Sequence, residues 1–299
     1  MRITEALTAS LAIEPGPKPR DDELDLFGLT HQGLVRSENQ DQFLLGTVHQ
    51  QIYIHGTSLP ELERNPLRSE RLATIMLVAD GVGGGIAGAD ASQITAARIA
   101  HYLTSTMNCY HARGAEKEFL DALQNAAIEA HQAVRAEAAA RASAEINPGK
   151  KSMASTLTVG LAVWPWLYVL QVGDSRCYRF LDGKLRQVTR DQTLAQDLVD
   201  RGALPAETAS ESPFSNVLAS AIGGREAHPV VSRINLHKAG CIVLLCSDGL
   251  TKHVNDEEIA EHCATMTSAE QLCQSLLDLV LERGGSDNTT IVVGRARPQ

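Results

Sequence analysis

The feature that most constrains this chain is a pattern that occurs three times, an apolar strand-like run with an aspartate at one end. Residues 75–79 lead into Asp80-Gly81, residues 241–246 lead through a serine into Asp248-Gly249, and Asp287 directly precedes residues 288–293. Each aspartate has a plain structural explanation, because Asp and Gly favour turns, and Asp248 could also cap the next helix. Three acids at the ends of strands nevertheless suggest one shared site.

Carboxylates at strand ends are suitable ligands for hard divalent cations such as Mg²⁺ and Mn²⁺, which take oxygen ligands. The Asp80 carboxylate could bridge two metal ions while the carbonyl of Gly81 binds one of them, since glycine has no side chain to obstruct it. Asp248 and Asp287 would complete the set.

A further acid follows an arginine in the stretch Arg-Ser-Glu-Asn-Gln-Asp at 36–41. Arg36 could be one half of a surface ion pair. A guanidinium also matches two phosphate oxygens and offsets the charge of nearby acids. Metals, an arginine and glycine-rich backbone together suit hydrolysis of a phosphate ester, because the metals generate hydroxide near neutral pH.

The composition narrows the function classes. A formal net charge of −9 argues against general nucleic-acid binding, which depends on a basic surface. The sequence contains no apolar run near the ~18 residues of a membrane span and no secretory signal layout. We therefore expect a cytoplasmic protein that binds neither nucleic acid nor membrane. We expect the six cysteines, which include no C-x-x-C pair, to be reduced structural residues.

Hydrophobic periodicity predicts the order of the elements. Strands are expected at 27–30, 42–47, 71–79, 155–162, 167–172, 177–181, 184–188, 241–246 and 288–294, and helices at 87–107, 116–144, 193–202, 256–262 and 268–283. Strands joined by hairpins and helices in pairs indicate an α+β fold with sheets between helical layers. Residues 1–24 are expected to be a flexible leader, 25–296 a single domain and 48–69 an excursion of unassigned role.

Taken together, these stretches resemble the protein phosphatase 2C family of metal-dependent serine/threonine phosphatases, particularly its compact bacterial members. The matching segments occur in the family's order at 36–41, 78–84, 88, 91–92, 155–157, 172–176, 181–183, 189–193, 218–223, 246–250 and 286–289. The resemblance implies a central β-sandwich of two antiparallel sheets flanked by pairs of α-helices, a four-layer αββα arrangement. It also implies two Mn²⁺ or Mg²⁺ ions at one edge.

The resemblance implies a role for each site residue. Asp80 would bridge the metals, the Gly81 carbonyl and a water held by Asp41 would serve one ion, and Asp248 and Asp287 would serve the other. Arg36 would bind the substrate phosphate, which a metal-bridging hydroxide attacks. Asp174 would support the site as a buried pair with Arg176, and Asn288 would fix the Asp287 loop. Residues 188–221 occupy the place of the family's flap, either as a connection or as a substrate-selecting segment.

Three positions depart from the family pattern. Gln40 stands where many relatives have an acid, and Val82 replaces a histidine that some relatives use as a general acid. The segment 149–156 has Lys150 and Lys151 where an acid often binds a third metal, so a third metal is doubtful.

Three functions are compatible with this sequence. The leading hypothesis is a phosphatase of phosphoserine and phosphothreonine proteins, a monomer that opposes a cognate serine/threonine kinase. The first alternative is a catalytically weak regulator that keeps the fold to bind phosphoproteins or a kinase. The second is a phosphatase acting on an antagonist of an anti-sigma factor. The complete set Asp41, Asp80, Asp248 and Asp287 beside Arg36 favours the first.

Overall fold

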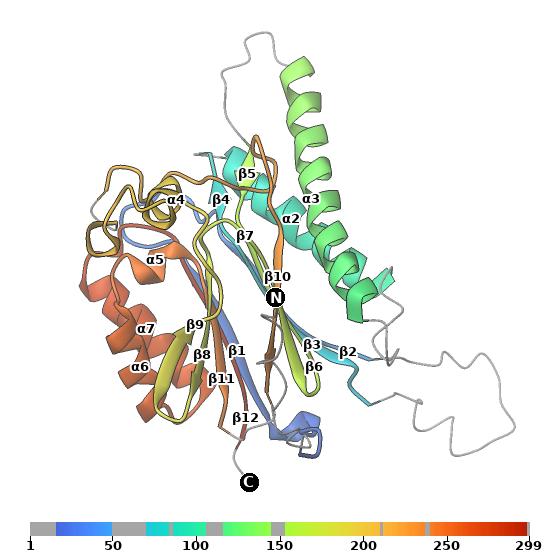
Figure 1. Ribbon diagram of the computed structural model, residues 1–299, viewed down its shortest axis with the longest axis vertical. Helices are drawn as coiled ribbons and strands as arrows, with labels where there is room; N and C mark the ends of the chain where they lie inside the picture. The colour runs from blue at the N-terminus through green and yellow to red at the C-terminus, as the bar shows by residue number, and fades with distance from the viewer. Residues whose placement is uncertain are drawn as a thin grey trace, which may run out of the picture.

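Two antiparallel five-stranded sheets face each other and form a sandwich (Figure 1). The computed structural model describes residues 16–49, 70–83, 86–105, 116–144, 153–209, 212–236 and 240–297. The first sheet contains, in spatial order, β1 (Leu24–His31), β12 (Thr289–Ala296), β11 (Ile242–Cys246), β8 (Arg176–Leu181) and β9 (Lys184–Gln187). The second contains β10 (Val230–Asn235), β7 (Trp166–Val172), β6 (Leu157–Val163), β3 (Ala73–Ala79) and β2 (Gln42–Val48). A small ladder joins β4 (Gly81–Val82) to β5 (Ala154–Ser155).

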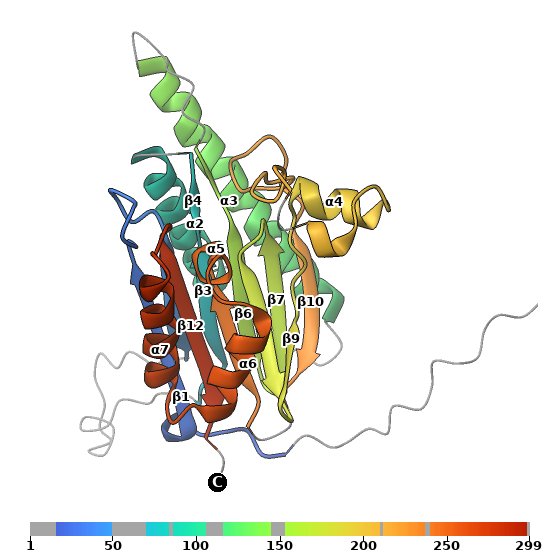
Figure 2. The same cartoon turned by 90° about the vertical axis from the view of Figure 1, so that its left-hand side faces the viewer.

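Helices cover the outer faces of both sheets, as the sequence predicted. The pair α2 (Ile86–Ser105) and α3 (Glu116–Ala144) lies on the second sheet, and α6 (Asp256–Thr265) and α7 (Ala269–Glu282) lie on the first (Figures 1 and 2). The single-turn helix α5 (Asp248–Thr251) follows β11. Helix α4 (Leu194–Asp200) and the 3-10 turn η2 (Ala206–Thr208) belong to the segment 188–221, which lies beside the sandwich (Figure 2).

Buried apolar side chains of the described residues fall into three clusters, one for each interface between layers. One lies between α2, α3 and the second sheet, one between α6, α7 and the first sheet, and one between the two sheets. In the last cluster Met76 and Val78 of β3 meet Leu245 and Val292 of the first sheet. Burial on both faces explains why these strands are continuous apolar runs rather than alternating ones.

Local sequence fixes the ends of the helices. Asn255 accepts a hydrogen bond from the backbone N–H of Glu258, whose carboxylate accepts one from the Asn255 N–H, so α6 begins with a capping box. Ser268 caps α7 by accepting from the Gln271 N–H. The helix predicted at 116–144 has those bounds in the structure.

Some elements differ from the sequence expectation. Strand β10 was missed, because it is an edge strand that follows a long polar segment. The helix predicted at 193–202 is shorter, since Thr193 is its N-cap and accepts from the Gln196 N–H. Strand β1 begins at Leu24, earlier than the expected start at residue 27. In the segment just before β1, the Pro19 carbonyl accepts a hydrogen bond from Arg71 Nη2 at 2.7 Å.

Several sequence predictions concern residues that the structure does not describe. The residues outside the described ranges include Gly84, Cys109, Lys150, Lys151, most of the expected leader and nearly all of the segment 48–69. The other five cysteines are buried free thiols, and burial raises the pKa of Cys246 to about 12. No helix within the described part of the chain is both long and apolar enough to cross a membrane.

The packing of α3 predicts a contrast between two of its residues. Leu123 is 1% exposed within the apolar cluster between α2, α3 and the second sheet, whereas Ile128 on the same helix is 42% exposed. We expect Leu123→Ala to lower the free energy of unfolding by about 2–5 kcal/mol, and Ile128→Ala by about 1 kcal/mol or less. Urea unfolding followed by circular dichroism measures both. Equal losses would contradict the described packing of α3.

Candidate metal centre

Strand register brings the predicted acids to one end of the sandwich. In the second sheet Gln42 pairs with Ala79, so Asp41 and Asp80 lie next to each other just beyond the ladder. In the first sheet Cys246 pairs with Ile291, which places Asp248 and Asp287 near the same end. Each sheet therefore contributes two carboxylates, and they interact electrostatically across the gap between the sheets.

Asp41 is held by hydroxyl groups of the opposite sheet. Its Oδ2 accepts hydrogen bonds from Ser247 Oγ and Thr290 Oγ1, both at 2.7 Å, while its buried Oδ1 has no partner among the described residues. Burial raises the pKa of Asp41 to about 6, although the two hydroxyl donors act in the other direction. A carboxylate with one fixed oxygen and one unpaired oxygen is prepared to accept a further donor or a cation.

Asp80 lies close to several other carboxylates. Burial, and then the neighbouring carboxylates of Asp41 and Asp248, raise the pKa of Asp80 well above its usual value. Its backbone is fixed by Thr156, whose Oγ1 accepts from the Asp80 N–H at 3.0 Å and whose N–H donates to the Asp80 carbonyl at 2.8 Å. This carboxylate therefore needs positive charge nearby in order to ionise.

Gly81 is required by close packing of the backbone. A Cβ at this position would lie 2.3 Å from the Gly88 carbonyl oxygen and 2.8 Å from that of Gln40. The Gly81 N–H donates to the Gln40 carbonyl at 3.2 Å, so the chain after Asp80 is held against the segment that carries Asp41. The structure thus gives a steric reason for the Asp-Gly pair.

Asp248 and Asp287 are neutralised by two cations. Lys252 Nζ lies 2.6 Å from Asp248 Oδ2 and 2.7 Å from Asp287 Oδ2. Arg36 contacts both oxygens of Asp287, with Nε 2.7 Å from Oδ1 and Nη2 2.8 Å from Oδ2. Burial alone would raise the pKa of Asp287, but hydrogen bonds from these cations hold it below its usual value.

The expectation for Asp174 was wrong in one respect. Arg176 does not pair with Asp174, because Asp191 offers it a bidentate partner, with Nη2 to Oδ2 at 2.7 Å and Nε to Oδ1 at 3.0 Å. Asp174 is 9% exposed at the wall of the cleft. Burial first, and then the charges of Asp248 and Asp191, raise the pKa of Asp174 to about 7.

Asn288 ties two loops together. Its Oδ1 accepts from the Gln40 N–H at 2.9 Å, and its Nδ2 donates to the carbonyls of Gln32 at 2.8 Å and Glu38 at 2.9 Å. The Asp287 loop is thereby joined to the segment that carries Arg36 and Asp41.

The sequence analysis missed four residues of this site: Ser247, Thr290, Asp191 and Lys252. The only local signal concerned Lys252, which lies four residues after Asp248, a spacing that brings side chains together on a helix. The others are contacts between distant parts of the chain.

The donor set fits a hard divalent cation. The buried Oδ1 atoms of Asp41 and Asp248 have no hydrogen-bond partner among the described residues, and the charge of Asp248 raises the pKa of both Asp41 and Asp80. Within the described ranges, however, no three acidic, His or Cys side chains converge as a finished ligand set. Two of these acids, Asp248 and Asp287, instead form ion pairs with Lys252 and Arg36.

A polar cleft of about 650 Å³ opens above these carboxylates. Its lining includes Arg36, Asp248 and Asp287, and it also includes Gln196 and Ser215 from the segment 188–221 that carries α4 and η2. An isolated antiparallel β-bridge between Thr193 and Leu218 joins the two ends of the segment 188–221. The predicted flap therefore lies beside the site.

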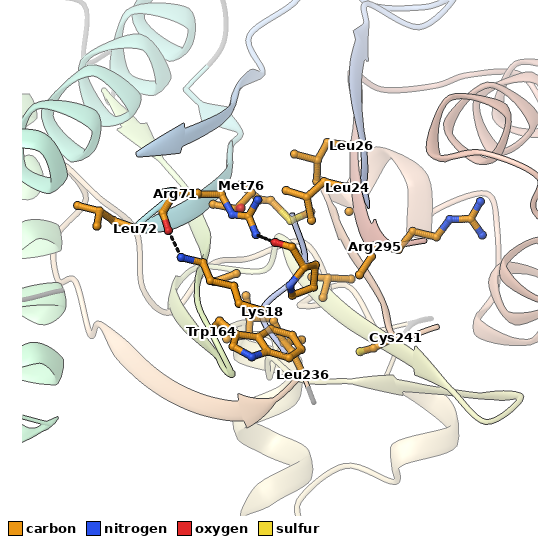
Figure 3. Close-up of a pocket in the computed structure, with 17 residues that line it drawn as sticks. Lys18, Leu24, Leu26, Arg71, Leu72, Met76, Trp164, Leu236, Cys241 and Arg295 are labelled. Atoms are coloured by element: carbon orange, nitrogen blue, oxygen red, sulfur yellow. Dashed lines mark hydrogen bonds between the residues drawn. The ribbon is translucent and has the colours of Figure 1, made fainter. Parts of the chain in front are cut away.

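A second, mostly apolar pocket of about 80 Å³ lies at the other ends of the strands (Figure 3). It is lined where β1, β3 and β11 begin and β12 ends, with Lys18 and Arg71 at its rim. Both rim cations already have partners, since Lys18 donates to the Arg71 carbonyl and Arg71 pairs with Asp21. This pocket is remote from the carboxylates and has no part in their chemistry.

Comparison with known proteins agrees with this geometry. A family model described as protein phosphatase 2C matches residues 67–281. The serine/threonine protein phosphatase PstP of Mycobacterium tuberculosis is 34% identical over 263 residues, covering 88% of this chain and 43% of that protein. The chain thus spans less than half the length of this relative. The serine/threonine phosphatase stp of Listeria monocytogenes is 27% identical over 219 residues, covering 73% of this chain and 83% of that protein.

Solved structures are similar over most of the chain. A crystal structure of M. tuberculosis PstP/Ppp has a TM-score of 0.69 and 30% identity, covering 92% of this chain and 99% of that one. A structure of the PstP catalytic domain in complex with two manganese ions has a TM-score of 0.67, 30% identity and the same coverage. The likeness confirms the expected αββα sandwich.

The crowding at Gly81 predicts a steric effect at the site. We expect Gly81→Ala to lower the free energy of unfolding by about 2 kcal/mol or more, because neither neighbouring carbonyl can move freely. Gly46→Ala is the matched control, since a Cβ on Gly46 of β2 would meet nothing within 4 Å. Thermal unfolding of the metal-free proteins measures both, and equal midpoints would contradict the described backbone contact.

The raised pKa of Asp174 predicts how metal-free stability depends on pH. A carboxyl titrating near 3.9 when unfolded and about 7 when folded binds more protons in the native state between those values. Stability should therefore fall as pH rises from about 4 to 7, and Asp174→Asn should retain up to a few kcal/mol more than wild type at pH 8. Melting curves in chelator at pH 4, 6 and 8 test this, and parallel curves would contradict it.

Proposed function

The chain belongs to the protein phosphatase 2C family, and we propose on this basis that it is a metal-dependent protein serine/threonine phosphatase using two Mn²⁺ or Mg²⁺ ions. The observation that carries the proposal is a cluster of carboxylates in which the buried Oδ1 atoms of Asp41 and Asp248 lack any partner in the described structure. A site built with unpaired buried acceptors needs cations to be complete.

Asp80, Asp248, Asp287 and the Gly81 carbonyl would hold the ions, with Asp41 holding a water. Bound ions would activate water near neutral pH and stabilise the displacement at phosphorus. Ser247 and Thr290 fix one oxygen of Asp41, so its free oxygen is aimed by two hydrogen bonds of 2.7 Å. No side chain at Val82 can donate a proton, so solvent in the open cleft would protonate the leaving alkoxide.

Arg36 would bind the substrate phosphate. Its side chain is 52% exposed at the edge of the cleft, and its contacts with Asp287 use Nε and Nη2. The remaining guanidinium donors are geometrically able to meet phosphate oxygens. The cleft volume of about 650 Å³ leaves room for a side chain carrying a phosphate, which suits phosphoserine and phosphothreonine.

The partners follow from this activity. We propose that the substrates are phosphoproteins and that the enzyme opposes a serine/threonine kinase in a signalling pathway. A cytoplasmic location, a monomeric state and the lack of nucleic-acid or membrane binding remain predictions from the sequence. A third metal remains doubtful on the sequence argument, and residues 150–151 lie outside the described structure.

A catalytically weak regulator is the competing function. Loss of one of the acids would favour it, but Asp41, Asp80, Asp248 and Asp287 are all present at one end of the sandwich. An arrangement that only bound phosphoproteins would have no need for buried carboxylates with unpaired oxygens. The structure therefore gives no observation that favours the regulator.

Phosphate release from a phosphothreonine peptide tests the proposal. We expect release with Mn²⁺ or Mg²⁺, none in excess chelator, and a loss of at least about 100-fold for Asp248→Asn, because the variant removes a ligand charge. Asp278→Asn, on the exposed face of α7, is the control and should keep full activity. Absence of release from folded wild-type protein with either metal would establish the regulator instead.

A further inference from the structure

Lys252 occupies a position that none of the expected ligand roles explains. Its ammonium lies within 2.7 Å of one oxygen from each of Asp248 and Asp287, the two acids that would share one metal ion. Its side chain is 28% exposed, less than the 52% of Arg36. Arg36 contacts Asp287 but has no ion pair with Asp248 in the described structure. Lys252 is thus the cation that bridges the pair.

The local fold holds Lys252 in this place. The residue ends the single turn α5, and its N–H donates to the Asp248 carbonyl at 2.9 Å. This turn puts the lysine side chain on the same face as the Asp248 carboxylate. The ammonium also contacts Asp287 in the loop before β12. It therefore neutralises one acid from α5, Asp248, and one from that loop, Asp287.

Both oxygens of Asp287 already contact cations, so a divalent ion would compete with the ammonium there, whereas Oδ1 of Asp248 is unpaired among the described residues. A metal coordinated by Asp248 and Asp287 would lie within a few ångströms of the lysine charge, and like charges at that distance repel strongly in a partly buried site. The same ammonium stabilises the carboxylates when no metal is bound, because an unpaired buried charge is costly. Metal binding at Asp287 would therefore exchange one cation for another.

We propose that Lys252 is the resident counter-ion of the Asp248–Asp287 half of the site, and that an incoming divalent metal displaces its ammonium into the cleft. The proposal rests on the proposed function for the identity of the metal ligands. It makes Lys252 a positioning residue that sets metal affinity. The site then binds metal less tightly than it would without the ammonium, but its carboxylates are neutralised before metal binds.

Titration calorimetry with Mn²⁺ alone tests this without any substrate. We expect Lys252→Gln to bind Mn²⁺ at least about tenfold more tightly than wild type, since a repelling charge is removed. Lys252→Arg, which keeps the charge, should stay within about threefold of wild type. Lys184→Gln removes an exposed lysine on β9 and is the matched control. Equal or weaker binding by Lys252→Gln would overturn the proposal.

Thermal unfolding supplies a second measurement. Metal-free Lys252→Gln should melt several degrees below wild type, because Asp248 and Asp287 lose their counter-ion, and saturating Mn²⁺ should remove that difference. A deficit that persists unchanged in Mn²⁺ would show a purely structural lysine and overturn the proposal.

The outcomes separate this proposal from the proposed function. Equal Mn²⁺ binding by wild type and Lys252→Gln overturns the counter-ion role and leaves the metal-dependent phosphatase intact. Binding by Lys252→Gln alone supports the counter-ion role and argues against an active wild-type enzyme. If neither protein binds Mn²⁺, both proposals fail.

Discussion

The mutual repulsion of carboxylates gathered at one end of a β-sandwich is the constraint on which the rest of the site depends. Asp41 and Asp80 come from one sheet and Asp248 and Asp287 from the other, and the charges of Asp248 and Asp287 raise the pKa of both Asp41 and Asp80. The fold opposes this repulsion with hydroxyl donors from Ser247 and Thr290 and with the cation of Lys252. The free-energy cost of holding these carboxylates close together is therefore offset by groups near the strand ends of both sheets.

Sequence reasoning found what is encoded locally. Asp80, Asp248 and Asp287 stand out because an apolar run followed or preceded by an acid is visible within ten residues, and the αββα order follows from hairpins and helix pairs. Arg36 and Asp41 were noticed as an arginine and an acid in one short stretch, and the resemblance to the family added the role of Asp41. Ser247 and Thr290 could not be found in this way, since they lie 206 and 249 residues from Asp41 and serine and threonine are common in strands.

The misassigned partner of Arg176 has a similar origin. Proximity in sequence suggested Asp174, but a guanidinium takes the acid that offers two parallel hydrogen bonds, and Asp191 approaches from a loop fifteen residues away. As a result Asp174 faces the cleft without that neutralising charge. An ion pair is decided by geometry in three dimensions, which a linear spacing cannot show.

The hydrogen bonds of Asp41 have a mechanical consequence. The carboxylate belongs to the chain entering β2, whereas Ser247 directly follows β11 and Thr290 lies in β12 of the facing sheet, so this side chain links the two sheets at the end that carries the site. A displacement of one sheet along the other would break these hydrogen bonds and separate the acids that the two sheets contribute. The contacts that position Asp41 in the site therefore also help to hold the two sheets in their relative positions.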